Sequence, residues 1–154
     1  MENALTTPEL QKKLEYYCAY QERCHQEVVQ KLWTLGVPGP QQDELLVHLI
    51  THNFLNEERF AHTFTLSKFH QKNWGKVRIK NELKQRQLTE RLIRQALDSI
   101  PEEAYETTFE RLAEKTWEAI TGTNTLQKQK KFCDSLLRKG WESDRVYAKM
   151  KQLK

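Results

Sequence analysis

The amino-acid sequence predicts an all-α protein made of three tandem three-helix units. The chain of 154 residues contains only 5 Gly and 4 Pro, and long stretches such as 10–31 and 60–71 contain neither. Stretches of that length without either residue favour helices over strands joined by tight turns. A weak internal repeat recurs after 51 and again after 53 residues. That period is too long for a two-helix repeat and suits three helices per unit.

The repeat is carried by an apolar triplet with gaps of 4 and then 5 residues. It occurs three times, as Val28, Leu32 and Val37, as Ile79, Leu83 and Leu88, and as Phe132, Leu136 and Trp141. A further apolar pair follows each triplet: Leu45 and Leu49, Ile93 and Leu97, Val146 and Met150. We therefore predict three units at residues 1–55, 56–100 and 101–154, each ending in a helix-turn-helix-like pair.

Residues that favour helix ends support this division. Thr7 before Pro8 resembles an N-cap followed by proline in the first turn. Asn56 and Thr89 are further N-cap candidates, and Gly36 and Gly140 can end helices in the left-handed conformation.

Composition excludes several classes of protein. No apolar stretch approaches the ~18 residues of a membrane span, and residues 1–10 lack the basic and apolar regions of a signal peptide. We therefore expect a cytoplasmic protein. Cys18, Cys24 and Cys133 do not have zinc-site spacing, and neither a phosphate-binding loop nor a catalytic motif occurs. We expect reduced thiols, with Cys18 in the core, and no metal.

Charge is distributed unevenly along the chain. Residues 72–94 hold 8 Lys and Arg against 2 Asp and Glu, and residues 127–154 hold 9 against 3. The acidic segment 101–118 between them holds 2 against 6. Two basic blocks of this kind indicate an anionic partner, although ordinary solvent-exposed helix faces would give the same counts.

Three stretches resemble the RecX family of recombination regulators. Residues 53–61, NFLNEERFA, resemble the family signature G-aromatic-L-D-D-x-R-F-A. Residues 74–88, WGKVRIKNELKQRQL, resemble G-x-x-R-I-x-x-E-L-x-x-R-G-I, and residues 131–141, KFCDSLLRKGW, resemble an L-x-R-K-G-F ending. Residues 23–32 also fit the first repeat of the family, so the resemblance covers about 16–153.

Two glycines of these signatures are replaced. Asn53 replaces the first glycine, and asparagine tolerates the left-handed conformation nearly as well. Gln87 replaces the glycine after Arg86, so we expect the end of that helix to be built differently.

The resemblance implies a fold and a function. RecX-like proteins are modular three-helix repeats in an elongated, curved body that lies in the groove of the RecA–single-stranded DNA filament. They hinder filament extension, ATP hydrolysis and strand exchange, and so act in homologous recombination, DNA repair and the SOS response. The family is not enzymatic and uses no cofactor. The expected partner is therefore the RecA recombinase filament, with single- or double-stranded DNA as a further candidate. We expect a monomer that does not bind a membrane.

The candidate partner- or DNA-binding residues lie in the two basic blocks. Lys76, Lys80 and Lys84 recur every four residues and share one face of a helix, which could follow a phosphate backbone or an acidic groove. The other candidates are Arg78, Arg86, Lys128, Lys130, Lys131, Arg138 and Lys139. Arg78 is also spaced to pair with Glu82, and Arg86 to stabilise a helix end.

Several other side chains favour packing over binding. We predict that Arg59 forms an ion pair that fixes the junction between units. Trp74 is predicted to cover a junction rather than to stack on a base, and Trp33, Trp117 and Trp141 to lie in a core or junction. Two other functions remain open: a helix-turn-helix DNA-binding protein, suggested by the basic helix 76–86, and a helical adaptor that binds no nucleic acid.

Overall fold

The protein is all-helical over the residues that the structure, a computed structural model, describes: 5–122 and 124–153. These ranges contain nine helices and no strand. The helices are α1 Thr7–Tyr20, α2 His25–Thr34, α3 Gly39–Thr51, α4 Glu57–Lys72, α5 Lys76–Gln85, α6 Glu90–Asp98, α7 Glu102–Ala119, α8 Thr125–Arg138 and α9 Ser143–Gln152.

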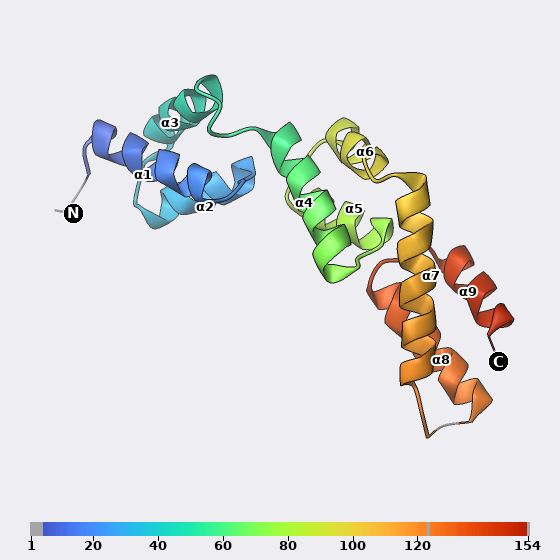
Figure 1. The fold of residues 1–154 in the computed structure, drawn as a ribbon. Coiled ribbons are helices and arrows are strands. Elements are labelled where there is room, and N and C mark those ends of the chain that lie inside the picture. Colours follow the sequence, from blue (N-terminus) through green and yellow to red (C-terminus); the bar gives the residue numbers. More distant parts are fainter. Residues whose placement is uncertain (1–4, 123, 154) are drawn as a thin grey trace.

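The helices form three successive groups along an elongated, curved body (Figure 1). We call α1–α3 unit 1, α4–α6 unit 2 and α7–α9 unit 3. The predicted fold class is confirmed. The helix bounds fit within the ranges 1–55, 56–100 and 101–154, which we retain as our proposal for the boundaries of the units.

The apolar triplets of the repeat form the centre of each unit. All nine side chains are buried, and none is more than 6% exposed. They do not form three separate cores, however. One cluster lies entirely within unit 1 and extends from Leu10 to Leu55. A second cluster is shared by units 2 and 3 and also contains Cys24 from unit 1.

Side-chain caps set several helix starts. Asn56 and Thr89 cap α4 and α6 as predicted, by accepting hydrogen bonds from the N–H groups of Arg59 and Leu92. The prediction for α1 was wrong by one residue, because Thr6 is the N-cap. The Thr6 side chain accepts from the Glu9 N–H, and the Glu9 carboxylate accepts from the Thr6 N–H. This reciprocal pair favours Thr6 over Thr7.

The left-handed positions after the helices correct a second prediction. Asn53 has a φ of 62°, as expected for a glycine substitute. Gln87 also has a positive φ, 65°, so α5 ends in the same way as a helix with glycine there. The end is therefore not built differently, and a residue with a side chain occupies a conformation that favours glycine.

The tryptophans divide between core and surface. Trp117 and Trp141 are 7% and 1% exposed, as predicted. Trp33 is 63% exposed, so its assignment to the core or a junction was wrong. It follows the fully buried Leu32 by one position, and a step of one residue turns a side chain by about 100° around a helix.

Within the described ranges, every helix is too short or too polar to cross a lipid bilayer. All three cysteines are buried and unpaired with one another, and Cys18 lies in the unit 1 core as predicted.

Candidate interaction surface

The three lysines that the sequence places on one helix face line a shallow groove between α5 and α6. Ile79 and Leu83 are fully buried and hold α5 against the core of unit 2. Lys80 and Lys84 each follow one of these residues by a single position and emerge beside α6. The groove has a volume of about 250 Å³ and is lined by Lys76, Lys80, Lys84, Glu90, Ile93, Arg94, Leu97 and Asp98. We call this the basic groove.

The basic groove combines an apolar floor with charged walls. Ile93 is buried and Leu97 half-buried beneath the lysines. Glu90 and Asp98 belong to the α6 wall, opposite the α5 lysines. Lys80 and Lys84 are exposed, and the described part of the chain offers neither an ion-pair partner within 4.0 Å. Their ammonium groups can therefore meet an anionic partner without breaking an internal ion pair.

Lys76 differs from the other two lysines because unit 3 covers it. Its backbone N–H donates to the Tyr105 hydroxyl at 2.8 Å, and its Nζ lies 4.8 Å from the centre of the Tyr105 ring. The same hydroxyl donates to a Glu142 carboxylate oxygen at 2.9 Å. Burial raises the pKa of Tyr105 above its usual value, so the phenol remains a neutral donor. Lys76 therefore has a structural role at the contact between units 2 and 3.

Arg78 belongs to that same contact. We call the contacts between units 2 and 3 the second seam. The Arg78 guanidinium donates to the Arg138 carbonyl at 3.2 Å and stacks over the Trp74 ring, 4.1 Å from its centre. The predicted pairing of Arg78 with Glu82 was wrong. Glu82 instead pairs with Arg86, with 2.9 Å between Arg86 Nη1 and Glu82 Oε1.

The second basic block is divided among several roles. Lys130 pairs with Asp134 at 2.8 Å, and Lys128 Nζ lies 4.4 Å from the centre of the Trp117 ring. Lys131 and Arg138 are exposed, and Lys139 is half-buried. The structure thus brings Arg138 and Lys139 close to Lys76 and Arg78 at the second seam, but it does not gather all ten candidates into one patch.

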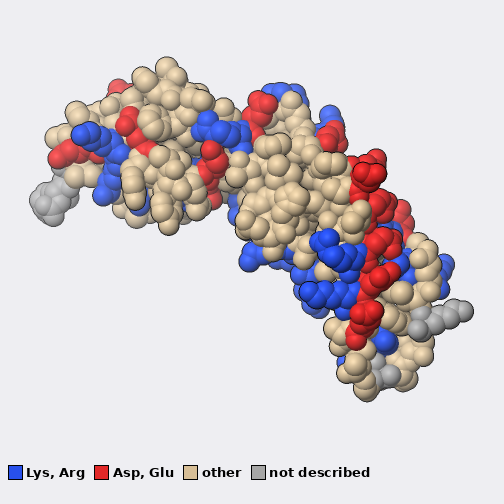
Figure 2. Space-filling view, viewed as in Figure 1, with Lys and Arg blue, Asp and Glu red and all other residues tan. Residues whose placement is uncertain are grey.

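Much of the remaining charge is paired inside unit 3. Figure 2 shows a row of acidic side chains along α7, with basic side chains on the side of this row toward α5. From α9, Arg145 pairs with Glu106 at 2.6 Å, and Lys149 with Glu110 at 2.5 Å. These two cations of the second basic block therefore neutralise part of the acidic segment.

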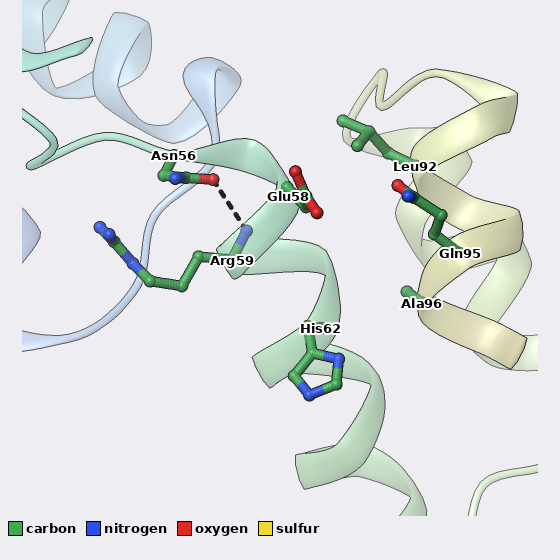
Figure 3. Close-up of a pocket in the computed structure, with 7 residues that line it drawn as sticks. All are labelled: Asn56, Glu58, Arg59, His62, Leu92, Gln95 and Ala96. Atoms are coloured by element: carbon green, nitrogen blue, oxygen red, sulfur yellow. Dashed lines mark hydrogen bonds between the residues drawn. The ribbon is translucent and has the colours of Figure 1, made fainter. Parts of the chain in front are cut away.

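A larger hollow between α4 and α6 lacks such a cluster of cations. It has a volume of about 570 Å³ and is lined by Asn56, Glu58, Arg59, His62, Leu92, Gln95 and Ala96. In Figure 3 Glu58 and His62 lie near α6, while the Arg59 side chain extends away from it. Arg59 reaches unit 1 instead, where its Nε lies 2.7 Å from Glu22 Oε2. The predicted junction role of Arg59 thus agrees with its contacts.

Trp74 also packs as predicted, because its ring lies edge-on to Phe64 and beneath the cations of Lys68 and Arg78. No group of three His, Cys, Asp or Glu side chains suited to a metal ion occurs among the described residues.

Comparisons with known proteins point to one family. The family model "RecX, second three-helix domain" matches residues 56–97. The chain is 26% identical over 155 residues to the regulatory protein RecX of Bacillus cytotoxicus. That alignment covers 99% of this chain but 57% of the relative, so the chain spans little more than half of the relative's length.

Two solved structures share the fold. A crystal structure of regulatory protein RecX superposes with a TM-score of 0.82 at 21% identity, covering 96% of this chain and 72% of that one. A crystal structure of RecX from Lactobacillus salivarius gives a TM-score of 0.79 at 22% identity, covering 96% of this chain and 97% of that one.

Proposed function

We propose that this chain is a RecX-type regulator of a RecA recombinase, because a RecX domain model matches residues 56–97 and two RecX structures share its fold. In this proposal it binds the filament that RecA forms on single-stranded DNA and inhibits filament extension, ATP hydrolysis and strand exchange. It acts by binding alone, without a catalytic group or a cofactor.

The observation that carries the proposal is the basic groove. Lys80 and Lys84 are exposed in a groove with an apolar floor. Unpaired cations beside apolar surface suit an acidic protein surface, because carboxylates can meet the lysines while apolar side chains cover Ile93 and Leu97. DNA phosphates of the filament would satisfy the lysines but not the apolar floor. We therefore assign the groove mainly to a protein contact.

The test is RecA ATPase activity on single-stranded DNA with and without this protein. We expect inhibition at a modest excess of the protein over RecA. No inhibition under these conditions would contradict the proposal. Sequence-selective binding to duplex DNA would instead favour a helix-turn-helix DNA-binding protein, which the basic helix α5 also suggests.

A double substitution tests the basic groove itself. Lys80→Ser with Lys84→Ser should weaken ATPase inhibition, and the variant should lose less inhibition than the wild type as salt rises. Lys76 is left unchanged because it packs against Tyr105. Circular dichroism should be nearly unchanged, since exposed substitutions shift stability by only about 0.5 kcal/mol each.

The matched control is Lys12→Ser with Lys13→Ser on α1, which removes the same charge from two exposed lysines of unit 1. Equal inhibition by both double variants would mean that the groove contributes only net charge, and the contact would then be sought on α8 around Lys131 and Arg138.

A further inference from the structure

The internal repeat allows the two contacts between units to be compared position by position. We call the contacts between units 1 and 2 the first seam. Cys24 is the N-cap of α2 and Gly75 is the N-cap of α5, 51 positions later. Gln87 follows α5 and Gly140 follows α8, 53 positions later. The second seam therefore has glycine at the two positions where the first seam has cysteine and glutamine.

The glycines allow two backbones to touch at the second seam. The Gly75 N–H donates to the Lys139 carbonyl at 2.9 Å, and the Val77 N–H donates to the Gly140 carbonyl at 3.0 Å. A Cβ on Gly75 would meet the Gly140 carbonyl, and a Cβ on Gly140 would meet Arg78. Behind these bonds Tyr105 packs between Phe69 and Trp141, with ring centres 5.9 and 4.6 Å away, so one apolar core crosses the seam.

The first seam is joined by side chains instead. No backbone–backbone hydrogen bond crosses it within the described residues. Arg59 pairs with Glu22 at 2.7 Å, Glu57 accepts from the His25 N–H at 3.0 Å, and Gln26 donates to the Gln85 carbonyl at 3.1 Å. Apart from Cys24, the buried apolar side chains of unit 1 form their own core.

Polar contacts leave the first seam incompletely closed. A cavity of about 330 Å³ lies there, lined by Gln21, Glu22, Glu27, Phe60, Thr63, Phe64, Ser67, Lys68 and Arg86. Glu22 Oε1 is buried beside it without a hydrogen-bond partner. The Arg59 and Glu22 side chains are 35% and 27% exposed, and ion pairs of this exposure are weak and screened by salt.

We propose that the first seam is a hinge, on which unit 1 moves as a body against a rigid pair formed by units 2 and 3. The Glu22–Arg59 ion pair holds the hinge closed, and its rupture exposes the edge of α2 that carries Cys24. This mechanism rests on the two seams alone and does not depend on RecA binding.

Cys24 provides a natural reporter of hinge opening. It is 0% exposed, whereas Cys18 and Cys133 are 4% and 6% exposed. Burial raises the pKa of all three thiols, that of Cys18 to about 11. If the structure did not open, Cys24 would therefore react no faster than Cys18 or Cys133. Trypsin places the three cysteines in separate peptides, because a Lys or Arg lies between each pair.

The experiment is alkylation of the native, full chain, followed by mass spectrometry of the three peptides. Arg59→Gln should increase the rate at Cys24 by about threefold, since an exposed ion pair shifts an equilibrium by up to about fivefold. The rate at Cys133 should not change, and the rate at Cys18 should not increase, because the Arg59 charge lowers the pKa of the Cys18 thiol. The matched control is Arg145→Gln, which breaks an ion pair inside unit 3 and should leave Cys24 unaffected.

Two further measurements guard against a variant that merely loosens the fold. In the wild-type chain, added sodium chloride should accelerate alkylation of Cys24 and leave Cys133 unchanged. The amides of Gly75 and Val77 should remain protected from hydrogen exchange in the wild type and in Arg59→Gln. The hinge is overturned if salt does not affect Cys24 in the wild type, or if Arg59→Gln accelerates all three cysteines equally.

Discussion

Gln87 shows how a single residue can carry backbone strain in an otherwise regular repeat. Its φ is 65°, while Gly36 and Gly140 occupy the matching positions of units 1 and 3 with φ of 75° and 98°. For a residue with a Cβ, the left-handed conformation costs on the order of 1 kcal/mol. The strain is tolerated because the following residue, Leu88, is buried in the core and fixes the turn.

We therefore predict that Gln87→Gly raises the free energy of unfolding by about 0.5–1 kcal/mol. The Gln87 side chain is exposed, so its removal sacrifices little packing. Urea denaturation measures the change. Lys80→Gly is the control, because this exposed residue lies in the interior of α5 and the substitution should lower the free energy of unfolding by up to about 1 kcal/mol. A loss of stability in Gln87→Gly would show that the side chain makes contacts that outweigh the strain.

Three residues show where the sequence was and was not sufficient to predict the structure. Asn53 was correctly expected to be left-handed, because asparagine is a familiar substitute for glycine there. Gln87 was not, since glutamine has no such preference and only the fixed positions of its neighbours impose the conformation. Trp33 was misplaced because an apolar side chain next to a buried leucine is indistinguishable, by hydropathy alone, from a core residue.

At the scale of elements, the stretches that carry the family resemblance are the stretches that meet at the seams. Residues 74–88 and 131–141 contain both glycines of the second seam, and residues 53–61 contain Arg59 of the first. The repeat predicted the helices and their buried faces because it depends on local spacing. The pairing of Gly75 with Gly140 was not predictable, because it joins distant segments. Arg78 and Arg86 each lie four residues from Glu82, so spacing alone does not say which of them pairs with it. Arg86 does, because Arg78 contacts Trp74 and Arg138 instead.

We predict that Gly75→Ala lowers the free energy of unfolding by about 1–3 kcal/mol, the usual effect of forcing an extra methyl into a packed site. The new Cβ would lie 2.7 Å from the Trp141 Cα and would force the second seam apart. Urea denaturation measures the loss, and hydrogen exchange should show weaker protection of the Val77 amide.

Gly39→Ala is the matched control, since a Cβ there meets nothing within 4 Å. It should lower stability by less than Gly75→Ala does, because only the preference of a residue before proline for extended backbone opposes it. If the two variants were equally stable, the close approach of Gly75 and Gly140 would not exist in solution.

At the scale of the whole molecule, three structural units are held by two cores. The apolar triplets of the repeat correctly predicted buried side chains, but they could not reveal that units 2 and 3 share one core. That property depends on Tyr105 and Trp141, which reach across the second seam to Asn73 and Lys76. Among the described residues of unit 1, Cys24 alone joins the core of units 2 and 3 across the first seam. We propose from this difference that units 2 and 3 form one rigid body and that unit 1 folds separately.

Two matched core substitutions, one in each core, test this division. Leu32 and Leu136 are fully buried, one in each core, so either change to alanine should cost about 2–5 kcal/mol. Hydrogen exchange in Leu136→Ala should show weaker protection in unit 2 as well as unit 3, for example at the Leu83 amide. Leu32→Ala should weaken protection in unit 1 alone, for example at Leu14 and Leu49.

If Leu32→Ala weakened all three units equally, the chain would unfold as one cooperative body. If instead Leu136→Ala spared unit 2, the second seam would not couple its neighbours, and backbone contact between glycines would be insufficient to join two helical repeats into one stable unit.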